Sequence, residues 1–352
     1  MSSSPVTLAQ IAKISGLSRS TVSYALRNDP LASQETRERV QKLAAEMGYK
    51  PNPLLAAWMA QRRGSRDNGG HEVIAYVTAF GRGERWRTSA THLRQFRGAL
   101  ERGRATGYKV EVFDTTPDQM SAKRLSDILT TRGIRGIIVA PLPAHHGTLE
   151  LAWDKFAAVS IGYSLAEPLL HRVTVDHYHS MLMTMEKLRM AGARRIGFAF
   201  PEDNVLRVDG IWQSVYLLYQ AGVPTKSRVP LFMPPAADWK SANFLAWFDK
   251  HKPDAIVCGQ SSPRDWLVAR PAVEAQHVRF AQVNFSGDGG ADCGVDQYHE
   301  LVGATALDMV AAQLQHNELG VPVNPRVIMT KGRWSDQLAA KGSAPTPAVI
   351  GL

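Results

Sequence analysis

The chain has few of the residues that mark disulfide-rich or metal-binding proteins. Its 352 residues include only two cysteines, Cys258 and Cys293. Two are too few for a disulfide framework, so we expect reduced, buried thiols. No Cys and His residues have the spacing of metal ligands, and the adjacent His145 and His146 stand in a Pro- and Gly-rich stretch that favours a surface loop. We therefore expect no metal and no other cofactor.

Long apolar runs are also missing. No stretch approaches the roughly 20 apolar residues that cross a bilayer. The first ten residues, MSSSPVTLAQ, lack the basic segment and apolar core of an export signal. The sequence therefore predicts a cytoplasmic protein without a membrane partner.

Motifs of nucleotide and hydrolase chemistry are absent. No GxGxxG follows a strand candidate and no GxxxxGK[ST] occurs, while Gly81-Arg82-Gly83 lacks the rest of either pattern. No Gly-x-Ser-x-Gly turn is present, and Ser, His and Asp residues are scattered. We expect no catalytic residues and no enzyme activity.

Positive charge is present, and it is concentrated near the N-terminus. The net charge is +9, and residues 1–66 hold ten Lys and Arg against four Asp and Glu. The rest of the chain holds 31 basic and 28 acidic residues. This asymmetry favours a polyanion-binding head on a nearly neutral body.

Residues 6–27 have the pattern of a helix-turn-helix. Thr7 and Gln10 form a capping box at the start of one helix, and Gly16 stands where a short turn tolerates positive φ. Ser18 can cap a second helix over 19–26. A small amphipathic helical pair without a DNA role would show the same periodicity.

A third helix is expected over 34–47, with Ser33 as its cap and Gly48 at its end. In the second helix, apolar residues point inward and leave a polar face outward. The start of such a helix is the part that reads base edges in a major groove. The outward residues are Arg19, Ser20, Ser23 and Tyr24.

The N-terminal region resembles the DNA-binding headpiece of the LacI/GalR family over residues 6–63. The matching motifs are TLAQIAKISGLSRSTVSYALRN and ASQETRERVQKLAAEMGYKPNP. The resemblance implies a three-helix, lambda-repressor-like headpiece that binds double-stranded operator DNA as a homodimer. The DNA-contacting residues that it implies are Thr7, Ser18, Arg19, Ser20, Thr21, Ser23, Tyr24, Asn52, Leu55 and Trp58.

Within that set, Arg19 suits direct base readout, with Ser20 and Tyr24 beside it. The family more often has Arg where this chain has Tyr24. The hydroxyl residues Thr7, Ser18 and Thr21, with Asn52, are expected to hold phosphates.

Trp58 occupies the position where the family commonly has a hinge-helix leucine. The resemblance implies that its ring enters the minor groove as an apolar wedge. The alternative is that Trp58 and Met59 pack the two hinge segments against each other or against the core.

From residue 71 strands and helices alternate, which predicts an α/β fold with parallel sheets. Strand candidates are 73–78, 109–113, 136–140, 157–161, 195–200, 255–258 and 280–284. Helix candidates are 91–106, 119–132, 180–191, 208–221 and 242–250. The family resemblance implies a core of two lobes like type I periplasmic binding proteins.

The expected organisation is a headpiece over 1–52, a hinge helix and linker over 53–70, a core over 71–340 and a tail over 341–352. Within the core, lobe 1 is expected over about 71–173 and 298–326. Lobe 2 is expected over about 174–297 and 327–340.

An effector site is expected in the cleft between the lobes, at the carboxyl ends of strands. Arg207-Val208-Asp209-Gly210 resembles the family's Arg-x-x-Gly, whose arginine binds the effector, although Arg207 could instead be an exposed residue at a helix start. Aromatic and polar candidates join Arg207 in this predicted site. They are Phe80, Trp86, Asp176, Trp239 and Gln260.

One departure bears on the effector. The family's Gly-(Phe/Tyr)-Asp-(Asp/Asn), which supplies an effector-binding Asp, is here Val283-Asn284-Phe285-Ser286. The sequence therefore does not identify the effector.

The sequence predicts a ligand-responsive repressor of a pseudo-palindromic operator, acting as a cytoplasmic, nucleoid-associated bacterial homodimer. Two alternatives remain. One is a small-molecule-binding protein with a degenerate DNA head, and the other is an enzyme on the same core.

Overall fold

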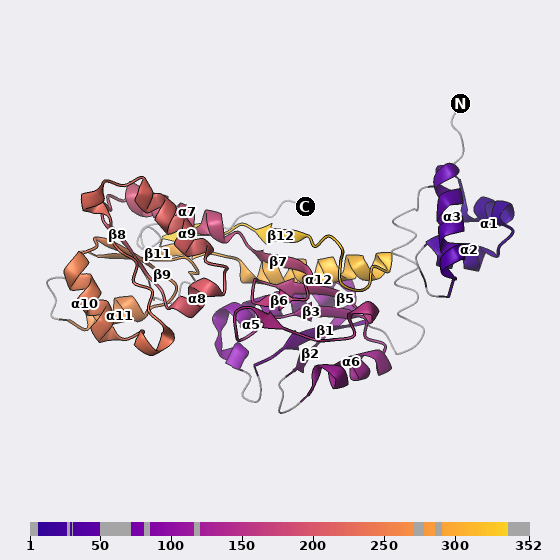
Figure 1. The fold of residues 1–352 in the computed structure, drawn as a ribbon, viewed down its shortest axis with the longest axis horizontal. Helices are drawn as coiled ribbons and strands as arrows, with labels where there is room; N and C mark the ends of the chain where they lie inside the picture. Colours follow the sequence, from indigo (N-terminus) through magenta and orange to yellow (C-terminus); the bar gives the residue numbers. More distant parts are fainter. Residues whose placement is uncertain are drawn as a thin grey trace.

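The computed structural model describes residues 6–26, 29, 31–49, 72–80, 85–115, 120–270, 278–285 and 291–336. These residues form a helical headpiece and a body of two α/β lobes with parallel sheets (Figure 1). The predicted fold class is confirmed.

The headpiece consists of three short helices around one small core. They are α1 (Leu8–Ser15), α2 (Arg19–Leu26) and α3 (Gln34–Glu46). Ile11, Val22 and Val40, one from each helix, are fully buried against one another. All three predicted helices are present, and α3 ends one residue earlier than expected.

Lobe 1 is built on a six-stranded, fully parallel sheet in the order β12-β7-β5-β3-β1-β2. Its strands are β1 (Glu72–Thr78), β2 (Tyr108–Asp114), β3 (Gly136–Val139), β5 (Ala157–Ile161), β7 (His171–Val175) and β12 (Val327–Thr330). A small two-stranded sheet joins β4 (Gly147–Thr148) and β6 (Leu165–Glu167).

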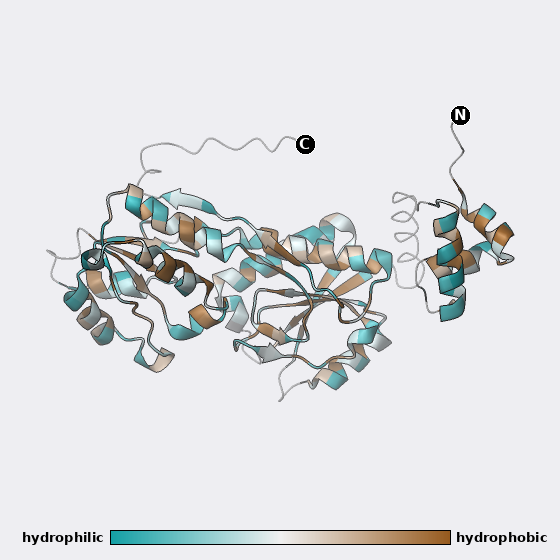
Figure 2. Cartoon of the chain, turned by 45° about the horizontal axis from the view of Figure 1, so that its top comes forward, coloured by the Kyte–Doolittle hydropathy of each residue, from teal (hydrophilic) through white to brown (hydrophobic). Residues whose placement is uncertain are grey.

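Both faces of the lobe 1 sheet are covered by helices. Alternate strand residues such as Tyr76 and Ile138 pack on one face with α5 (Ala90–Thr106) and α12 (His299–His316). Their neighbours pack on the other face with α6 (Ala122–Thr131). The inner strands β3 and β5 are therefore mostly hydrophobic, whereas the edge strand β2 carries Lys109 and Glu111. Figure 2 shows hydrophobic strands in brown inside the lobes.

Lobe 2 has a five-stranded sheet in the order β13-β11-β10-β9-β8, in which only β13 is antiparallel. Its strands are β8 (Ile196–Ala199), β9 (Ala255–Cys258), β10 (Arg279–Gln282), β11 (Cys293–Asp296) and β13 (Arg333–Asp336). Its helices are α7 (His177–Met190), α8 (Glu202–Leu206), α9 (Ile211–Ala221), α10 (Ser241–His251) and α11 (Ser262–Val268). The 3-10 turns η1 to η4 span Arg85–Thr88, Trp153–Lys155, Thr225–Ser227 and Ala236–Asp238.

The chain crosses between the lobes three times, and two crossings lie later than predicted. The first follows Val175, because Thr174 and Val175, which were assigned to lobe 2, continue β7 and pair with β12 in the lobe 1 sheet. The third follows Thr330, because β12 adds to the edge of the lobe 1 sheet beside β7. The expected return to lobe 2 at residue 327 is wrong by one strand.

The helices α5 and α12 cross at two glycines. A Cβ on Gly98 would lie 1.9 Å from the carbonyl oxygen of Glu300, and one on Gly303 would lie 1.8 Å from that of Gln95. The absence of both side chains lets the two backbones touch, which brings the first turns of α5 and α12 together.

No helix among the described residues is long and apolar enough to cross a membrane.

Candidate functional site

The first headpiece helix begins with the predicted capping box. The Thr7 amide donates to Gln10 Oε1 over 2.7 Å, and the Gln10 amide donates to Thr7 Oγ1 over 3.4 Å. Gly16 ends the helix at φ 72°, a left-handed conformation that glycine adopts without strain. The turn into α2 is thus determined by local sequence.

The start of α2 is exposed where base or phosphate contacts were predicted. The Ser18 hydroxyl accepts from the Thr21 amide over 3.0 Å and lies 2.9 Å from Thr21 Oγ1, so these two side chains cap the helix. Arg19 and Ser20 follow with exposed side chains. A helix start that projects a guanidinium and a hydroxyl into solvent is suited to contact base edges.

The other predicted DNA contacts differ in exposure. Thr7 is exposed, whereas Ser23 and Tyr24 are half-buried, and the Tyr24 ring packs against the headpiece core. Tyr24 therefore contributes to headpiece stability as well as to the outer face of α2. The predicted hinge contacts Asn52, Leu55 and Trp58 lie outside the described residues.

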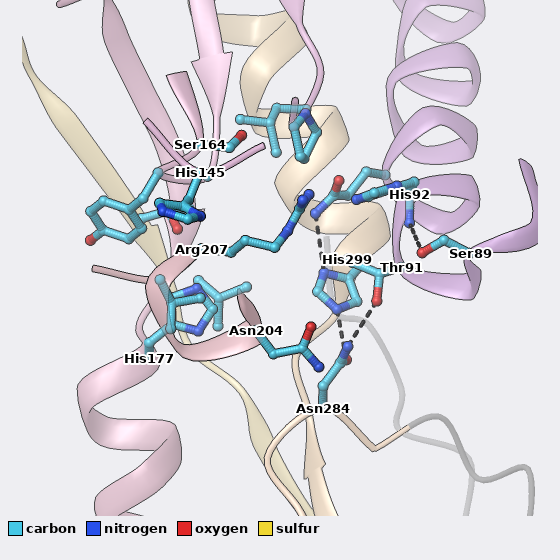
Figure 3. Close-up of a pocket in the computed structure, with 18 of the residues that line it drawn as sticks. Ser89, Thr91, His92, His145, Ser164, His177, Asn204, Arg207, Asn284 and His299 are labelled. Atoms are coloured by element: carbon cyan, nitrogen blue, oxygen red, sulfur yellow. Dashed lines mark hydrogen bonds between the residues drawn. The ribbon is translucent and has the colours of Figure 1, made fainter. Parts of the chain in front are cut away.

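A cavity of about 710 Å³ lies between the two lobes (Figure 3). Lobe 1 lines it with Phe80 beyond β1 and with the first turn of α5. Lobe 2 lines it with the first turn of α7, with α8, and with Asn284 beyond β10. The carboxyl ends of parallel strands from both sheets thus meet at the cavity, where α/β proteins bind small molecules.

Arg207 connects the two lobes across this cavity. It follows α8, and Asp209 and Gly210, both at positive φ, turn the chain directly after it. Its guanidinium donates to the carbonyl oxygens of Leu142, over 2.8 Å, and Pro143 in lobe 1. Burial lowers the pKa of Arg207, which the charge of Asp203 partly offsets.

Asn284 belongs to a second interlobe network. Its Nδ2 donates to Thr91 Oγ1 over 2.8 Å, while its Oδ1 lies 2.8 Å from His299 Nε2. The other ring nitrogen of His299 lies 3.4 Å from Gln95 Nε2. These contacts assign an Nε2-protonated, neutral imidazole, and burial together with Arg94 lowers the pKa of His299 to about 3.

Of the six predicted effector residues, Phe80 and Arg207 line the cavity and four do not. Trp86 is 1% exposed because its ring packs between Tyr76 and Phe96, so it cannot stack on a ligand in the cavity. Trp239 packs against Phe232 and Trp266 in lobe 2.

The two polar candidates, Asp176 and Gln260, do not line the cavity. Asp176 caps α7 by accepting from the His179 amide over 3.0 Å, and its other oxygen lies 2.7 Å from His179 Nδ1. Gln260 follows Gly259, and it is Gly259 that lines the cavity. Both oxygens of the Asp176 carboxylate thus contact His179 in the first turn of α7.

The cavity lining includes buried polar atoms that no sequence pattern indicated. Among the described residues, nine buried side-chain nitrogen and oxygen atoms have no hydrogen-bond partner, and six of them belong to lining residues. The six are His92 Nδ1, Gln95 Oε1, Thr174 Oγ1, His177 Nδ1, Trp212 Nε1 and Gln297 Nε2. Native proteins satisfy nearly all buried polar groups, so this concentration makes the cavity a candidate binding site for a polar molecule.

The described residues contain no group of three His, Cys, Asp or Glu side chains placed to hold a metal ion. The interlobe cavity is lined by hydrogen-bond donors and acceptors and by one guanidinium, that of Arg207. Such a lining suits reversible binding of a polar molecule.

The chain is similar to known transcriptional regulators. The regulator of the NTD biosynthesis operon from Bacillus subtilis is 27% identical over 201 residues, which cover 55% of each chain. The match thus spans about half the length of this relative. A transcriptional regulator CelR in complex with cellobiose has a TM-score of 0.55 at 18% identity, covering 94% of this chain and 98% of that one.

The lac repressor dimer bound to operator and an anti-inducer has a TM-score of 0.54 at 16% identity, with 94% and 98% of the two chains covered. At this identity both structures show the fold alone. The family model for bacterial regulatory proteins of the lacI family matches residues 7–52, the capped helix-turn-helix described above. The family likeness is thus carried by residues 7–52, which match the lacI family model, while the rest of the chain shares the fold of these regulators.

Proposed function

We propose that the protein is a sequence-specific DNA-binding transcriptional repressor that is controlled by a small molecule in the interlobe cavity. It binds a pseudo-palindromic operator as a homodimer, with one α2 helix in each major-groove half-site. It acts by binding and not by turnover, in the bacterial cytoplasm on nucleoid DNA.

The observation that carries this proposal is the exposed start of α2 on a capped, independently packed headpiece. Arg19 and Ser20 are exposed, whereas the apolar side of α2 is buried in the headpiece core. Arg19 can bind guanine O6 and N7 with two hydrogen bonds, a contact that is worth about 1–3 kcal/mol of discrimination. Thr7, Ser18 and Thr21 would supply hydroxyl contacts to phosphates, which fix the register on DNA.

The proposed effector site is the cavity, with Phe80 and Arg207 among its ligands. Because Arg207 and Asn284 hydrogen bond to lobe 1 from lobe 2, a ligand between them changes the free energy of lobe closure. Control of DNA binding then requires only that the ligand bind one arrangement of the lobes more tightly than the other. The fold shared with the lac repressor dimer supports the dimeric arrangement.

The test is a selection of DNA fragments by the purified full-length chain, followed by sequencing of the bound pool. We expect one recurrent motif of two inverted half-sites. Arg19→Ala should flatten base preference at one symmetric position, with about 1–3 kcal/mol of discrimination lost there.

Arg39→Ala is the matched control, because Arg39 is also exposed in the headpiece but lies on α3. Arg39→Ala removes the same charge as Arg19→Ala, but from outside the recognition helix, so the base preferences of the selected motif should be unchanged. A bound pool without any enriched motif, for the parent chain, would contradict the proposal.

A further inference from the structure

Three long helices begin at the interlobe cavity. These are α5 with 17 residues, α7 with 14 and α12 with 18. His92, His177 and His299 stand in their respective first turns, and all three line the cavity (Figure 3). Each helix start carries roughly half a positive charge from the aligned peptide dipoles, so three such ends favour negative charge in the space between them.

No carboxylate at the starts of these helices lines the cavity, and Glu300 in the first turn of α12 pairs with Arg94 and Arg97. Ser89, a neutral hydroxyl residue, caps α5, and no side chain caps α12. Asp176 caps α7, but its carboxylate hydrogen bonds to His179 and does not line the cavity.

The charged lining residues add one cation and one anion. Arg207 is the only Arg or Lys among the described lining residues, and Asp203 is their only carboxylate. Burial, together with Arg207, lowers the pKa of His92 to about 4, and burial, against the opposing charge of Asp176, lowers that of His177 to about 4. The three imidazoles are thus neutral near pH 7. The charges of Arg207 and Asp203 offset each other, so the helix starts make the electrostatic potential in the cavity positive.

Two of the unpartnered atoms can only donate hydrogen bonds. Trp212 is 7% exposed and Gln297 is 1% exposed, and neither Trp212 Nε1 nor Gln297 Nε2 has an acceptor. A buried donor left without an acceptor destabilises the protein, so both sites favour a ligand rich in acceptor oxygens. Gln95 Oε1 requires a donor instead, which a hydroxyl group provides.

Building on the proposed function of the cavity, we propose that its ligand is a hydroxylated organic anion. The anionic group, a carboxylate or a phosphate, is bound among the starts of α5, α7 and α12 and by Arg207. Trp212 and Gln297 donate to its oxygens, and a hydroxyl group donates to Gln95. The cavity, at about 710 Å³, has the size of sites that enclose small metabolites.

The test is calorimetric titration of the full-length chain, without DNA, with matched neutral and anionic compounds. The pairs are D-glucose with D-glucuronate and with glucose 6-phosphate, D-galactose with D-galacturonate, and cellobiose with cellobionate. We expect at least one anion to bind at least about tenfold more tightly than its neutral partner, a difference of about 1.4 kcal/mol. The carboxylate and phosphate arms distinguish the two forms of the anionic group.

Trp212→Phe keeps an aromatic ring and removes the donor, so it should weaken binding of that anion by about tenfold. Trp239→Phe is the control, because Trp239 Nε1 is also buried without a partner but lies outside the cavity lining. An equal effect of both variants would contradict the assignment of Trp212.

Tighter binding of the neutral compounds would overturn the proposal, and so would failure of every anion to bind at millimolar concentration. Neither result would affect the DNA selection, which is measured without ligand. Conversely, a chain that binds an anion but selects no DNA motif would reject the proposed function and leave this inference standing.

Discussion

The guanidinium of Arg207 donates to the carbonyl oxygen of Leu142 over 2.8 Å, so a side chain of lobe 2 is held by the backbone of lobe 1. Pro143 supplies a second carbonyl acceptor. These acceptors are neutral, so the positive charge of Arg207 is available to an anionic ligand in the same cavity. One side chain thereby joins lobe closure to ligand binding.

Arg207→Ala is expected to raise the dissociation constant of the bound anion at least about tenfold, because a charge-assisted hydrogen bond contributes about 1.5–3 kcal/mol. Operator affinity of the ligand-free protein should change by a smaller factor, because without ligand the variant loses only the two hydrogen bonds to lobe 1 carbonyl oxygens and no DNA contact. Calorimetry measures the first quantity and fluorescence anisotropy the second.

Arg270→Ala serves as the control for this prediction. Arg270 pairs with Asp249 within lobe 2, at 2.6 Å, and does not line the cavity. Its replacement should leave anion affinity unchanged. If Arg207→Ala also binds the anion normally, Arg207 acts only in lobe closure.

Acid is expected to destabilise the protein through its buried histidines. Burial lowers the pKa of His177 from 6.5 to about 4 and that of His299 to about 3. Between these values and 6.5 the unfolded chain binds more protons than the folded chain, so the free energy of unfolding falls as the pH falls. Urea unfolding at a series of pH values measures this slope.

His177→Gln should reduce that slope, because the variant has no imidazole to protonate on unfolding. His146→Asn, at an exposed position in a loop, should leave the slope nearly unchanged. Parallel slopes for all three proteins would show that His177 is not held neutral by burial.

Gly303→Ala is expected to destabilise the fold by about 1–3 kcal/mol or more through overpacking. The added Cβ would lie 1.8 Å from the carbonyl oxygen of Gln95, which belongs to the backbone and cannot rotate away. Gly222→Ala is the control, because its Cβ would meet only the Tyr219 carbonyl at an ordinary 3.6 Å. Thermal unfolding compares the two; equal midpoints would refute the close crossing of α5 and α12.

Trp58 remains a prediction from the sequence, since it lies outside the described residues. If its ring wedges into the minor groove, Trp58→Ala should lose most of the central DNA bend, while Trp58→Leu restores it. Electrophoretic bending assays on circularly permuted operator fragments measure the bend. A Trp58→Ala complex bent as sharply as the parent would place Trp58 in protein packing instead.

The headpiece could be predicted from the sequence because its signals are local. Thr7 and Gln10 are three residues apart, and Gly16 directly follows the helix that it ends. Helix α12 was not predicted, because it packs against both α5 and the lobe 1 sheet and is buried on several sides, which removes the periodic pattern of a surface helix.

The cavity lining was predicted only in part, because several of its residues come together only in the folded chain. Arg207 belongs to a short motif and Phe80 follows a recognisable strand, so both could be named. Gln95, Trp212 and Gln297 meet only in the folded chain, and nothing around them in sequence indicates that their polar atoms lack partners. Trp86 was misjudged because exposure of an aromatic residue after a strand depends on distant packing, here by Phe96.

The central claim is that a ligand in the interlobe cavity and operator DNA are energetically coupled. The most direct measurement is the dissociation constant of the selected operator with and without saturating anion, together with that of the anion with and without operator. Linkage requires both constants to change by the same factor, which is typically about 5–150 for allosteric proteins. Identical affinities in the presence and absence of the other partner would contradict the account.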